Sequence, residues 1–423
     1  MVGFMLGCMS SPDSIHMIDL SFYRRSASWL AATFLLAFAS SFGQTFFISL
    51  FSAEIRSEFG LSHGDFGQIY LFGTVASGVV LIWLGKLADH WRVITLGITT
   101  MIALAFAATG MAFVTHWWML LGAIFALRLF GQGMMSHISM TAAARWFDRD
   151  RGKALSLSSL GHPAGEALWP TIVVAMILIV GWRQTWLAAA GFLLVVIIPL
   201  FALLLAGKPA SPRKPSEDDD ANARAKRQWT RSAVLRSPQF YLLTPGLIAA
   251  PFIGTGMVFH QAHLAEQKGW TLKFFAASFA AYPFASVIAA FVTGFIIDRF
   301  SARRILPFFL LPMVGSLLLL ANSSAPYAAA VSMGLLGMTA GTASAMLGAI
   351  WAELYGTKHI GAIRSLAMAQ MVFATALAPG LMGVLIDAGV PLETQFVAMA
   401  AYTLAVSGFF IFLQPMLRSI AET

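Results

Sequence analysis

The chain has 423 residues, of which 58% are apolar and 11% charged, and its formal net charge is +8. Soluble domains average about 25% charged residues, so this composition excludes an ordinary soluble protein and predicts an all-α membrane protein. The single cysteine, Cys8, excludes an intrachain disulfide framework and a cysteine-rich metal site. We therefore expect no metal and no cofactor.

Twelve apolar stretches follow one another, and most reach the roughly 20 residues that a helix needs to cross a ~30 Å hydrocarbon core. A polar, proline-containing and charged stretch interrupts them at 207–238, which predicts a linker between two units, 1–206 and 239–423. The approximate spans are 27–52, 66–84, 93–114, 117–142, 154–180, 185–206, 240–264, 274–297, 305–321, 327–351, 365–386 and 395–414.

The basic residues are distributed unevenly between the predicted loops. Loops on the side of the N-terminus hold 22 of the 27 Lys and Arg residues, the opposite loops hold 4, and Arg128 lies inside a span. Basic residues are enriched on the cytoplasmic side of membrane proteins, so both termini are expected in the cytoplasm. The basicity is thus explained by topology, and we expect no nucleic-acid partner.

Polar residues inside the first two spans are expected to face the interior of the bundle, because lipid does not solvate them. Gln44 lies near the centre of the first span. Its amide is a candidate for binding a solute in a cavity, and a simple contact between helices is the alternative.

A short loop motif after the second span occurs twice. Gly85 to Asp89 is followed by His90 and Arg92, and 209 residues later Gly294 to Asp298 is followed by a basic run. That run contains Arg299 and Arg303. Repetition at one offset predicts two parallel copies of a structural unit.

This loop resembles the Gly-x-x-x-Asp-Arg-x-x-x-Arg loop of the major facilitator superfamily of secondary transporters, and the resemblance spans nearly the whole chain. It implies twelve transmembrane helices in two pseudo-symmetric six-helix halves. It also implies a gating role for the loop residues, in which Asp89 and Asp298 hold the cytoplasmic gate shut. The first copy departs from the pattern, since His90 stands where an arginine is usual. The gating residues predicted in this way are Gly85, Asp89, Arg92, Gly294, Asp298, Arg299 and Arg303.

Two charged residues are predicted deep in the membrane. Arg128 lies about 17 Å from the outer end of the fourth span, and Glu166 about 18 Å from the cytoplasmic end of the fifth. A charge at this depth needs a partner or a cavity. We therefore expect Arg128 and Glu166 to form a pair that binds substrate or couples protons, and a structural ion pair is the alternative.

Other polar residues in the spans are candidates for the same site. His162 precedes Glu166 by four residues and shares its helix face. The remaining candidates for substrate binding or proton coupling are His260, Gln261, Tyr282 and Gln370. Numerous Phe and Met residues nearby predict a mainly apolar cavity.

The sequence therefore predicts a secondary active transporter that moves a small organic solute by alternating access and couples it to protons. An uncoupled facilitator, a multidrug or metabolite efflux antiporter, and a transporter-derived sensor are the alternatives. No nucleotide loop, metal cluster or nucleophile triad is found, so an enzyme is not expected. We expect a monomer in a lipid bilayer, in a bacterial inner membrane.

The charge asymmetry gives a first testable prediction. Reporter fusions after Lys214 in the linker and after Thr423 at the C-terminus should both report a cytoplasmic position, because basic loops stay on that side. Alkaline phosphatase and green fluorescent protein fusions measure this directly. An external signal from either fusion would contradict the twelve-helix topology.

Overall fold

The computed structural model describes residues 20–147, 151–207, 229–356 and 359–422. Within these residues every regular element is a helix, and eleven helical segments are long and apolar enough to cross a membrane. A twelfth apolar helix, α19 (Leu311–Asn322), is shorter. The predicted all-α membrane fold is confirmed, and the twelve-helix count agrees approximately.

Helices α1 to α12 belong to the first half of the chain. Two of these elements are short 3-10 turns, η1 and η2, and two are π-helical segments, η3 and η4. The elements are α1 (Leu20–Ala39), η1 (Ser40–Gly43), α2 (Thr45–Ile48), η2 (Ser49–Phe51), α3 (Ser52–Phe59), α4 (His63–Leu84), α5 (Leu87–His90), α6 (Val93–Ala112), α7 (Trp117–Leu127), η3 (Arg128–Met135), α8 (Ser136–Trp146), α9 (Arg151–Ser159), α10 (Gly161–Val180), α11 (Trp182–Phe192), η4 (Leu193–Ile197) and α12 (Ile198–Leu205).

Helices α13 to α22 belong to the second half. Residues 208–228 of the predicted linker lie outside the described residues, and the chain resumes at Trp229, whose N–H donates to the Tyr355 carbonyl at 3.1 Å. The elements are α13 (Arg231–Leu235), α14 (Pro238–Phe259), α15 (Gln261–Gln267), α16 (Leu272–Ser278), α17 (Ala281–Phe300), α18 (Ala302–Ile305), α19, α20 (Pro326–Tyr355), α21 (Ile360–Asp387) and α22 (Leu392–Glu422).

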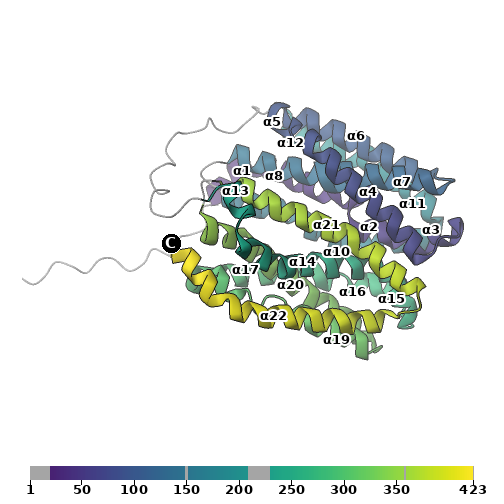
Figure 1. Ribbon diagram of the computed structural model, residues 1–423. Helices are drawn as coiled ribbons and strands as arrows, with labels where there is room; N and C mark the ends of the chain where they lie inside the picture. Colours follow the sequence, from purple (N-terminus) through teal and green to yellow (C-terminus); the bar gives the residue numbers. More distant parts are fainter. Residues whose placement is uncertain (1–19, 148–150, 208–228, 357–358, 423) are drawn as a thin grey trace, which may run out of the picture.

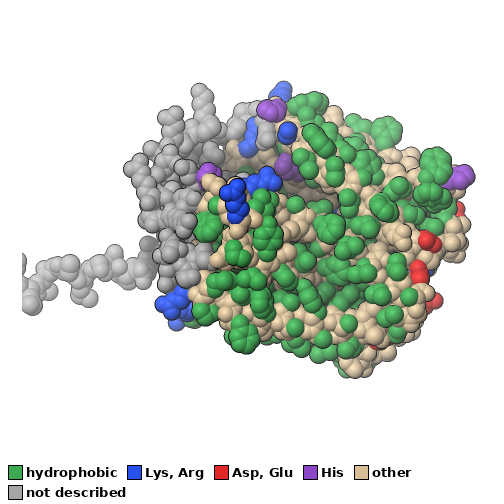
Figure 2. All heavy atoms as spheres, viewed as in Figure 1, with side chains coloured by type: hydrophobic (Ala, Val, Ile, Leu, Met, Phe, Trp, Pro, Cys, Tyr) green, Lys and Arg blue, Asp and Glu red, His purple; other side chains and the backbone are tan. Residues whose placement is uncertain are grey.

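The two halves lie side by side with their long helices roughly parallel (Figure 1). Across the seam between them, α4 packs on α21, and α10 packs on α16 and α17. The start of α1 and the C-terminus lie at one end, which we call the basic end, because Lys and Arg side chains gather there in Figure 2. The opposite end carries α3 and α15, and acidic side chains lie there.

Large apolar side chains point away from the bundle along much of its length. Val195, Phe295 and Phe412 are 74%, 76% and 83% exposed. Exposed apolar surface on this scale is not stable in water, whereas hydrocarbon chains of a bilayer cover it without cost.

Glycines allow helices within each half to approach closely. A Cβ atom added at Gly131 in η3 would lie 2.6 Å from the Gly43 Cα atom, so no larger residue fits without a shift of backbone. In the second half, Gly337 and Gly341 of α20 pack in the same way against carbonyl groups of α17. Small residues at four-residue spacing are typical of tightly packed membrane helices.

An arginine ties three elements together at the opposite end. Arg183 of α11 donates to Glu58 Oε1 of α3 at 2.5 Å and to the carbonyls of Ala112 and Val114 at the end of α6, at 2.6 and 2.7 Å. The hydrogen bond from Arg183 lowers the pKa of Glu58 below its ordinary value, and a hydrogen bond from Trp182 lowers it further. Partial burial of the carboxylate acts in the opposite direction.

The close contact at Gly131 gives a second prediction. Gly131→Ala should lower the free energy of unfolding by about 1–3 kcal/mol, because the methyl group overpacks the contact with Gly43. Thermal unfolding followed by tryptophan fluorescence in detergent measures the change. The matched control is Gly122→Ala on α7, where a Cβ atom has open space around it. Equal stability of the two variants would contradict the prediction.

The Glu58–Arg183 ion pair gives a third prediction. Because the pKa of Glu58 is lowered in the folded state, its charge stabilises the fold at pH values above about 4.5. This stabilisation is lost as the pH falls through the lowered pKa. Glu58→Gln should therefore lower the melting temperature at neutral pH, and the difference from the native chain should shrink toward zero near pH ~3. A difference that does not change with pH would show that the carboxylate charge contributes nothing.

Candidate transport pathway

The first membrane segment is broken near its centre. Helix α1 ends at Ala39, the 3-10 turn η1 follows, and Gln44 is extended, with φ −81° and ψ 155°, before α2 begins. A break of this kind frees backbone carbonyl groups, which membrane depth tolerates only beside protein or a cavity. Ser40 and Ser41 lie in the same turn and are buried, as expected for polar residues of this span.

Arg128 supplies a hydrogen-bond donor to a backbone carbonyl at this break. Its Nη1 atom donates to the Gly43 carbonyl at 3.1 Å and lies 3.5 Å from Thr45 Oγ1, and its guanidinium lies over the Tyr70 ring at 5.3 Å. The side chain is 1% exposed. Arg128 begins the π-helical segment η3, and π-helical turns frequently mark functional sites.

The predicted ion pair between Arg128 and Glu166 is absent from the described ion pairs. Instead of a carboxylate, Arg128 faces a carbonyl, a hydroxyl and an aromatic ring. The pair was predicted from the depths of the two residues along their helices, which do not show the direction in which each side chain points. Arg128 thus supports the wall behind Thr45, whose hydroxyl shares a 2.6 Å hydrogen bond with that of Tyr70.

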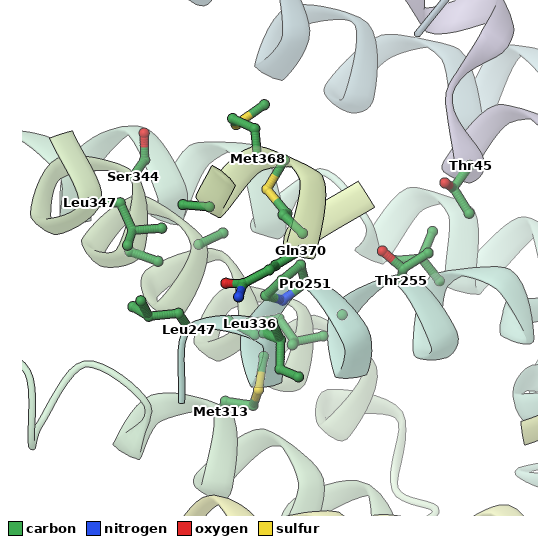
Figure 3. Close-up of a pocket in the computed structure, with 18 of the residues that line it drawn as sticks. Thr45, Leu247, Pro251, Thr255, Met313, Leu336, Ser344, Leu347, Met368 and Gln370 are labelled. Atoms are coloured by element: carbon green, nitrogen blue, oxygen red, sulfur yellow. The ribbon is translucent and has the colours of Figure 1, made fainter. Parts of the chain in front are cut away.

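A cavity of about 500 Å³ lies between the halves. Figure 3 shows side chains of the second half converging on it, with Thr45 facing them from the first half. Gln370 points among Leu247, Pro251 and Leu336. The polar and charged lining residues are Gln44, Thr45, Glu166, Thr255, Tyr282, Ser344, Arg364 and Gln370, and the remaining lining is mostly aliphatic, aromatic and methionine side chains.

The cavity reaches toward the basic end. Arg364 and Trp351 line it, and each lies about 6 Å from the basic end of its helix. Figure 2 shows a hollow between the halves near that end.

Glu166 lies in the cavity wall, half-buried, at the middle of the long segment formed by α9 and α10. The described hydrogen bonds and ion pairs include no partner for its carboxylate. Three predicted site residues, Gln44, Glu166 and Tyr282, therefore meet at one cavity, and Gln370 lines it from the second half, where it shares a 3.2 Å hydrogen bond with Thr244.

His162 lies one turn before Glu166 but does not line the cavity. Its Nδ1 atom is 3.2 Å from Ser40 Oγ, at the break in the first segment. The structure therefore places His162 behind the wall, between α10 and η1, and its predicted role in proton coupling stays a prediction.

Polar contacts close the seam at the opposite end. Gln261 Nε2 donates to Ser49 Oγ at 2.8 Å and to the Phe46 carbonyl at 3.2 Å, so this predicted site residue joins the halves instead of lining the cavity. His260, also predicted, is buried with Nε2 3.0 Å from the Pro379 carbonyl and likewise lies outside the cavity.

A carboxylate completes this closure. Asp387, at the end of α21, accepts hydrogen bonds from the backbone N–H groups of His63 at 3.1 Å and Gly64 at 2.7 Å. These groups begin α4 and have no partner within their own helix, and the positive end of the helix dipole favours a carboxylate there. The halves are thus sealed at one end and separated by a cavity toward the other.

The sequence pattern of the Major Facilitator Superfamily matches residues 33–278 and 247–420. The chain belongs to this superfamily.

Solved transporter structures share its fold. A bacterial homolog of the human lysosomal transporter Spinster, inward-facing and unoccupied, is 14% identical with a TM-score of 0.70, and the match covers 94% of this chain and 98% of that chain. The nucleoside transporter NupG is 13% identical with a TM-score of 0.68, over 92% of this chain and 98% of that chain. No curated protein matches the chain.

In this superfamily member, the first repeated loop is held within its own half. His137 Nε2 lies 3.1 Å from the Gly85 carbonyl, and Arg145 donates to the Ala88 carbonyl at 2.6 Å. The side chain of Asp89 lies outside the described residues, and Arg92 is exposed at the start of α6. The gating role of this loop stays a prediction.

The second repeated loop is organised by a different acid from the one expected. Asp298 is exposed on α17, near Gly294, and the described contacts include no partner for it. Glu353 of α20 instead accepts from Ser301 Oγ at 2.5 Å and from the Ala302 N–H at 2.9 Å, and Arg303 Nε lies 3.6 Å from it. Ser301 has a φ of 84°, a strained value that these bonds support.

Arg299, the remaining predicted gating residue, stacks its guanidinium over the neighbouring Phe300 ring at 5.4 Å. The sequence reasoning missed Glu353 and Asp387. A signal for Asp387 was present, because Gly383 to Asp387 repeats the Gly-x-x-x-Asp spacing of the two loops, here at the opposite end of the bundle.

The contact made by Asp387 gives a fourth prediction. Asp387→Asn should open the seam more often, because the two carboxylate oxygens each accept one helix N–H bond, whereas an amide has a single, uncharged acceptor oxygen. Ser52→Cys, at a position 6% exposed near the seam, should then react several-fold faster with a polar thiol reagent in a Cys8→Ser background.

The matched control is Asp65→Asn, because Asp65 caps the same helix within the first half and makes no described bond across the seam. A rate unchanged by Asp387→Asn, or raised equally by both variants, would show that Asp387 does not hold the seam closed.

Proposed function

We propose that the chain is a secondary active transporter that moves a small organic solute by alternating access and couples its movement to protons. The observation that carries this proposal is a cavity between two halves that is sealed at one end by breakable polar contacts. Rocking of the halves about the cavity would break this seal and form another at the basic end.

The basic end lies in the cytoplasm in this proposal, because basic side chains are favoured on that side of a membrane. The described conformation is then open to the inside. We place the transporter as a monomer in a bacterial inner membrane, with both termini in the cytoplasm.

The cavity wall favours a solute with an apolar body and at least one hydrogen-bonding group. Leu247, Met313, Leu336 and Met368 offer an apolar surface, while Gln44 and Gln370 offer amides on opposite sides. Arg128 does not line the cavity directly, so a strongly anionic solute is not favoured by the first half.

Glu166 is the proposed proton-coupling residue. Its carboxylate lines the cavity at mid-membrane and has no described partner that would hold it in one charge state. Apolar surroundings favour the neutral acid, and water favours the carboxylate, so a change in hydration between the two states of the transporter changes its proton affinity. A proton affinity that depends on conformation is what coupling requires.

An uncoupled facilitator is the second candidate function, since an apolar cavity alone suffices for it. An efflux antiporter would use the same cavity with proton and solute moving in opposite directions. A transporter-derived sensor would bind the solute without moving it across the membrane.

The role of Glu166 gives a fifth prediction. Glu166→Gln should keep the exchange of solute across reconstituted vesicles and lose accumulation driven by a pH gradient, because an amide cannot release a proton. A thermal-shift screen against a metabolite library in nanodiscs supplies the solute. Exchange and accumulation are then measured in the same vesicle preparation.

His162→Asn is the neighbouring control, because His162 lies one turn away and outside the cavity wall. Accumulation that persists in Glu166→Gln and disappears in His162→Asn would move the coupling role to the histidine. Native protein that exchanges solute but never accumulates it would favour the facilitator.

A further inference from the structure

Three histidines from both halves converge where the seam is sealed at the opposite end. The His63 ring of α4 lies 4.2 Å from the His263 ring of α15 and 5.9 Å from the His260 ring, measured between ring centres. They surround a small void that Ser52, Arg56, Phe66 and Phe259 also line. We call these three residues the imidazole cluster.

Few hydrogen-bond acceptors surround the cluster for the N–H groups that protonation would add. His260 Nε2 is engaged with the Pro379 carbonyl, and His263 Nε2 is buried without a hydrogen-bond partner. A doubly protonated imidazole donates from both nitrogens and needs an acceptor for each. The closed seam therefore accommodates neutral rings and disfavours charged ones.

Charged groups on the neighbouring helices also affect whether the rings are neutral or charged. Arg56 of α3 lines the void and repels a charged ring, and the positive end of the α4 dipole adds to this at His63. Asp387 of α21 faces His63 but is engaged by backbone N–H groups. Glu266 lies 4.0 Å from His263 and is 81% exposed, and Glu393 of α22 is paired with Lys268 at 2.9 Å.

We propose that the imidazole cluster is a second proton-binding site, which takes protons from the opposite end of the bundle and, once charged, holds that end open. The proposal rests on the alternating opening of the halves, but not on Glu166 or on any particular solute. In an open seam, His63 moves away from His260 and His263, because it belongs to the other half. Water then solvates each ring, and the ring of His63 no longer lies beside those of His260 and His263.

The direction of the pH effect follows from linkage. A closed seam holds the rings neutral, whereas an open seam lets them protonate near their ordinary value of about 6.5. Closure is therefore stable above this pH and is lost as the pH falls below it. The ratio of open to closed seams should rise by up to about tenfold per pH unit for each ring that titrates.

Distances between spin labels measure this ratio without any solute. The labels are attached at Ser57→Cys and Gln267→Cys, which are exposed positions at the opposite end on the first and second halves, in a Cys8→Ser background. Pulsed electron paramagnetic resonance in lipid nanodiscs reports the populations of short and long distances. Lowering the pH from about 7.5 to about 5.5 should raise the long-distance population about tenfold or more relative to the short one.

Replacing all three cluster residues (His63→Asn, His260→Asn and His263→Asn), in a Glu166→Gln background in which the cavity acid cannot titrate, should remove this pH response and keep the seam largely closed. The matched control is His116→Asn, an exposed histidine at the same end and outside the cluster, which should leave the response unchanged. Glu166→Gln alone removes only the contribution of the cavity acid, so a pH response carried by the cluster should remain.

Three outcomes would overturn the proposal. The distances could stay constant with pH, the response could persist when all three cluster histidines are replaced in the Glu166→Gln background, or it could disappear in Glu166→Gln alone, which would assign it to the cavity. None of these outcomes bears on the exchange and accumulation assays, so failure of this site is distinguishable from failure of the transport function.

Discussion

The hydrogen bond from Arg128 to the Gly43 carbonyl holds the centre of the first half together. A guanidinium in mid-membrane costs at least about 2.5 kcal/mol unless polar groups surround it, and a broken helix leaves a carbonyl that needs a donor. The guanidinium donates to this carbonyl, so each group supplies the hydrogen-bond partner that the other needs. The contact is possible because Gly43 and Gly131 let the two backbones touch. Gln44 and Thr45, the next residues, are consequently presented to the cavity.

Close backbone contact at glycines occurs both within the halves and across the seam. Within a half, glycines bring helix backbones into direct contact, and such surfaces are rigid because they cannot repack without moving whole helices. Across the seam, a Cβ atom added at Gly67 of α4 would lie 2.5 Å from the Pro379 carbonyl of α21, so these two backbones also touch. Hydrogen bonds at the helix ends add to this contact, each worth about 0.5–1.5 kcal/mol net, or somewhat more where the acceptor is charged. Three aromatic pairs among the described residues also cross the seam, namely Phe46 with Phe279, Phe66 with Phe259 and Tyr70 with Phe259. Opening of the seam therefore has to separate the α4 and α21 backbones as well as break these polar contacts.

The sequence predicted the features that depend on composition and spacing. Apolar runs set the number of membrane segments, and the repeated loop indicated two similar halves and the superfamily. Depth along a helix was also predictable, because the rise per residue is constant. The direction of a side chain around the helix was not, because η3 widens into a π-helix and shifts the angle between residues on either side of it. Arg128 and Glu166 were predicted at similar depths, but depth does not show which way each side chain points, and Arg128 points to Gly43 and Thr45.

Partners that come from distant segments were likewise beyond the sequence. Asp298 carries the motif, but Glu353 lies where the strained Ser301 needs an acceptor, and only the packing of α20 against α17 places it there. No sequence pattern marked His63 as a site residue, because it precedes its apolar span and a single histidine at a membrane interface is common. Its significance depends on α15 of the other half, which brings two more imidazoles to the same void.

The imidazole cluster lies within the seal, and the cavity acid lies on the side of the seal that faces the basic end, which has a consequence for coupling. In the described conformation the cavity side is open toward the basic end, while the cluster is closed. Rocking would exchange these conditions, hydrating the imidazoles as access to Glu166 from the basic end is lost. Protons taken up by the cluster would then come from the side that has just opened. A transporter arranged in this way senses the acidity of that side before the proton reaches the cavity, because opening and protonation of the cluster favour each other by linkage.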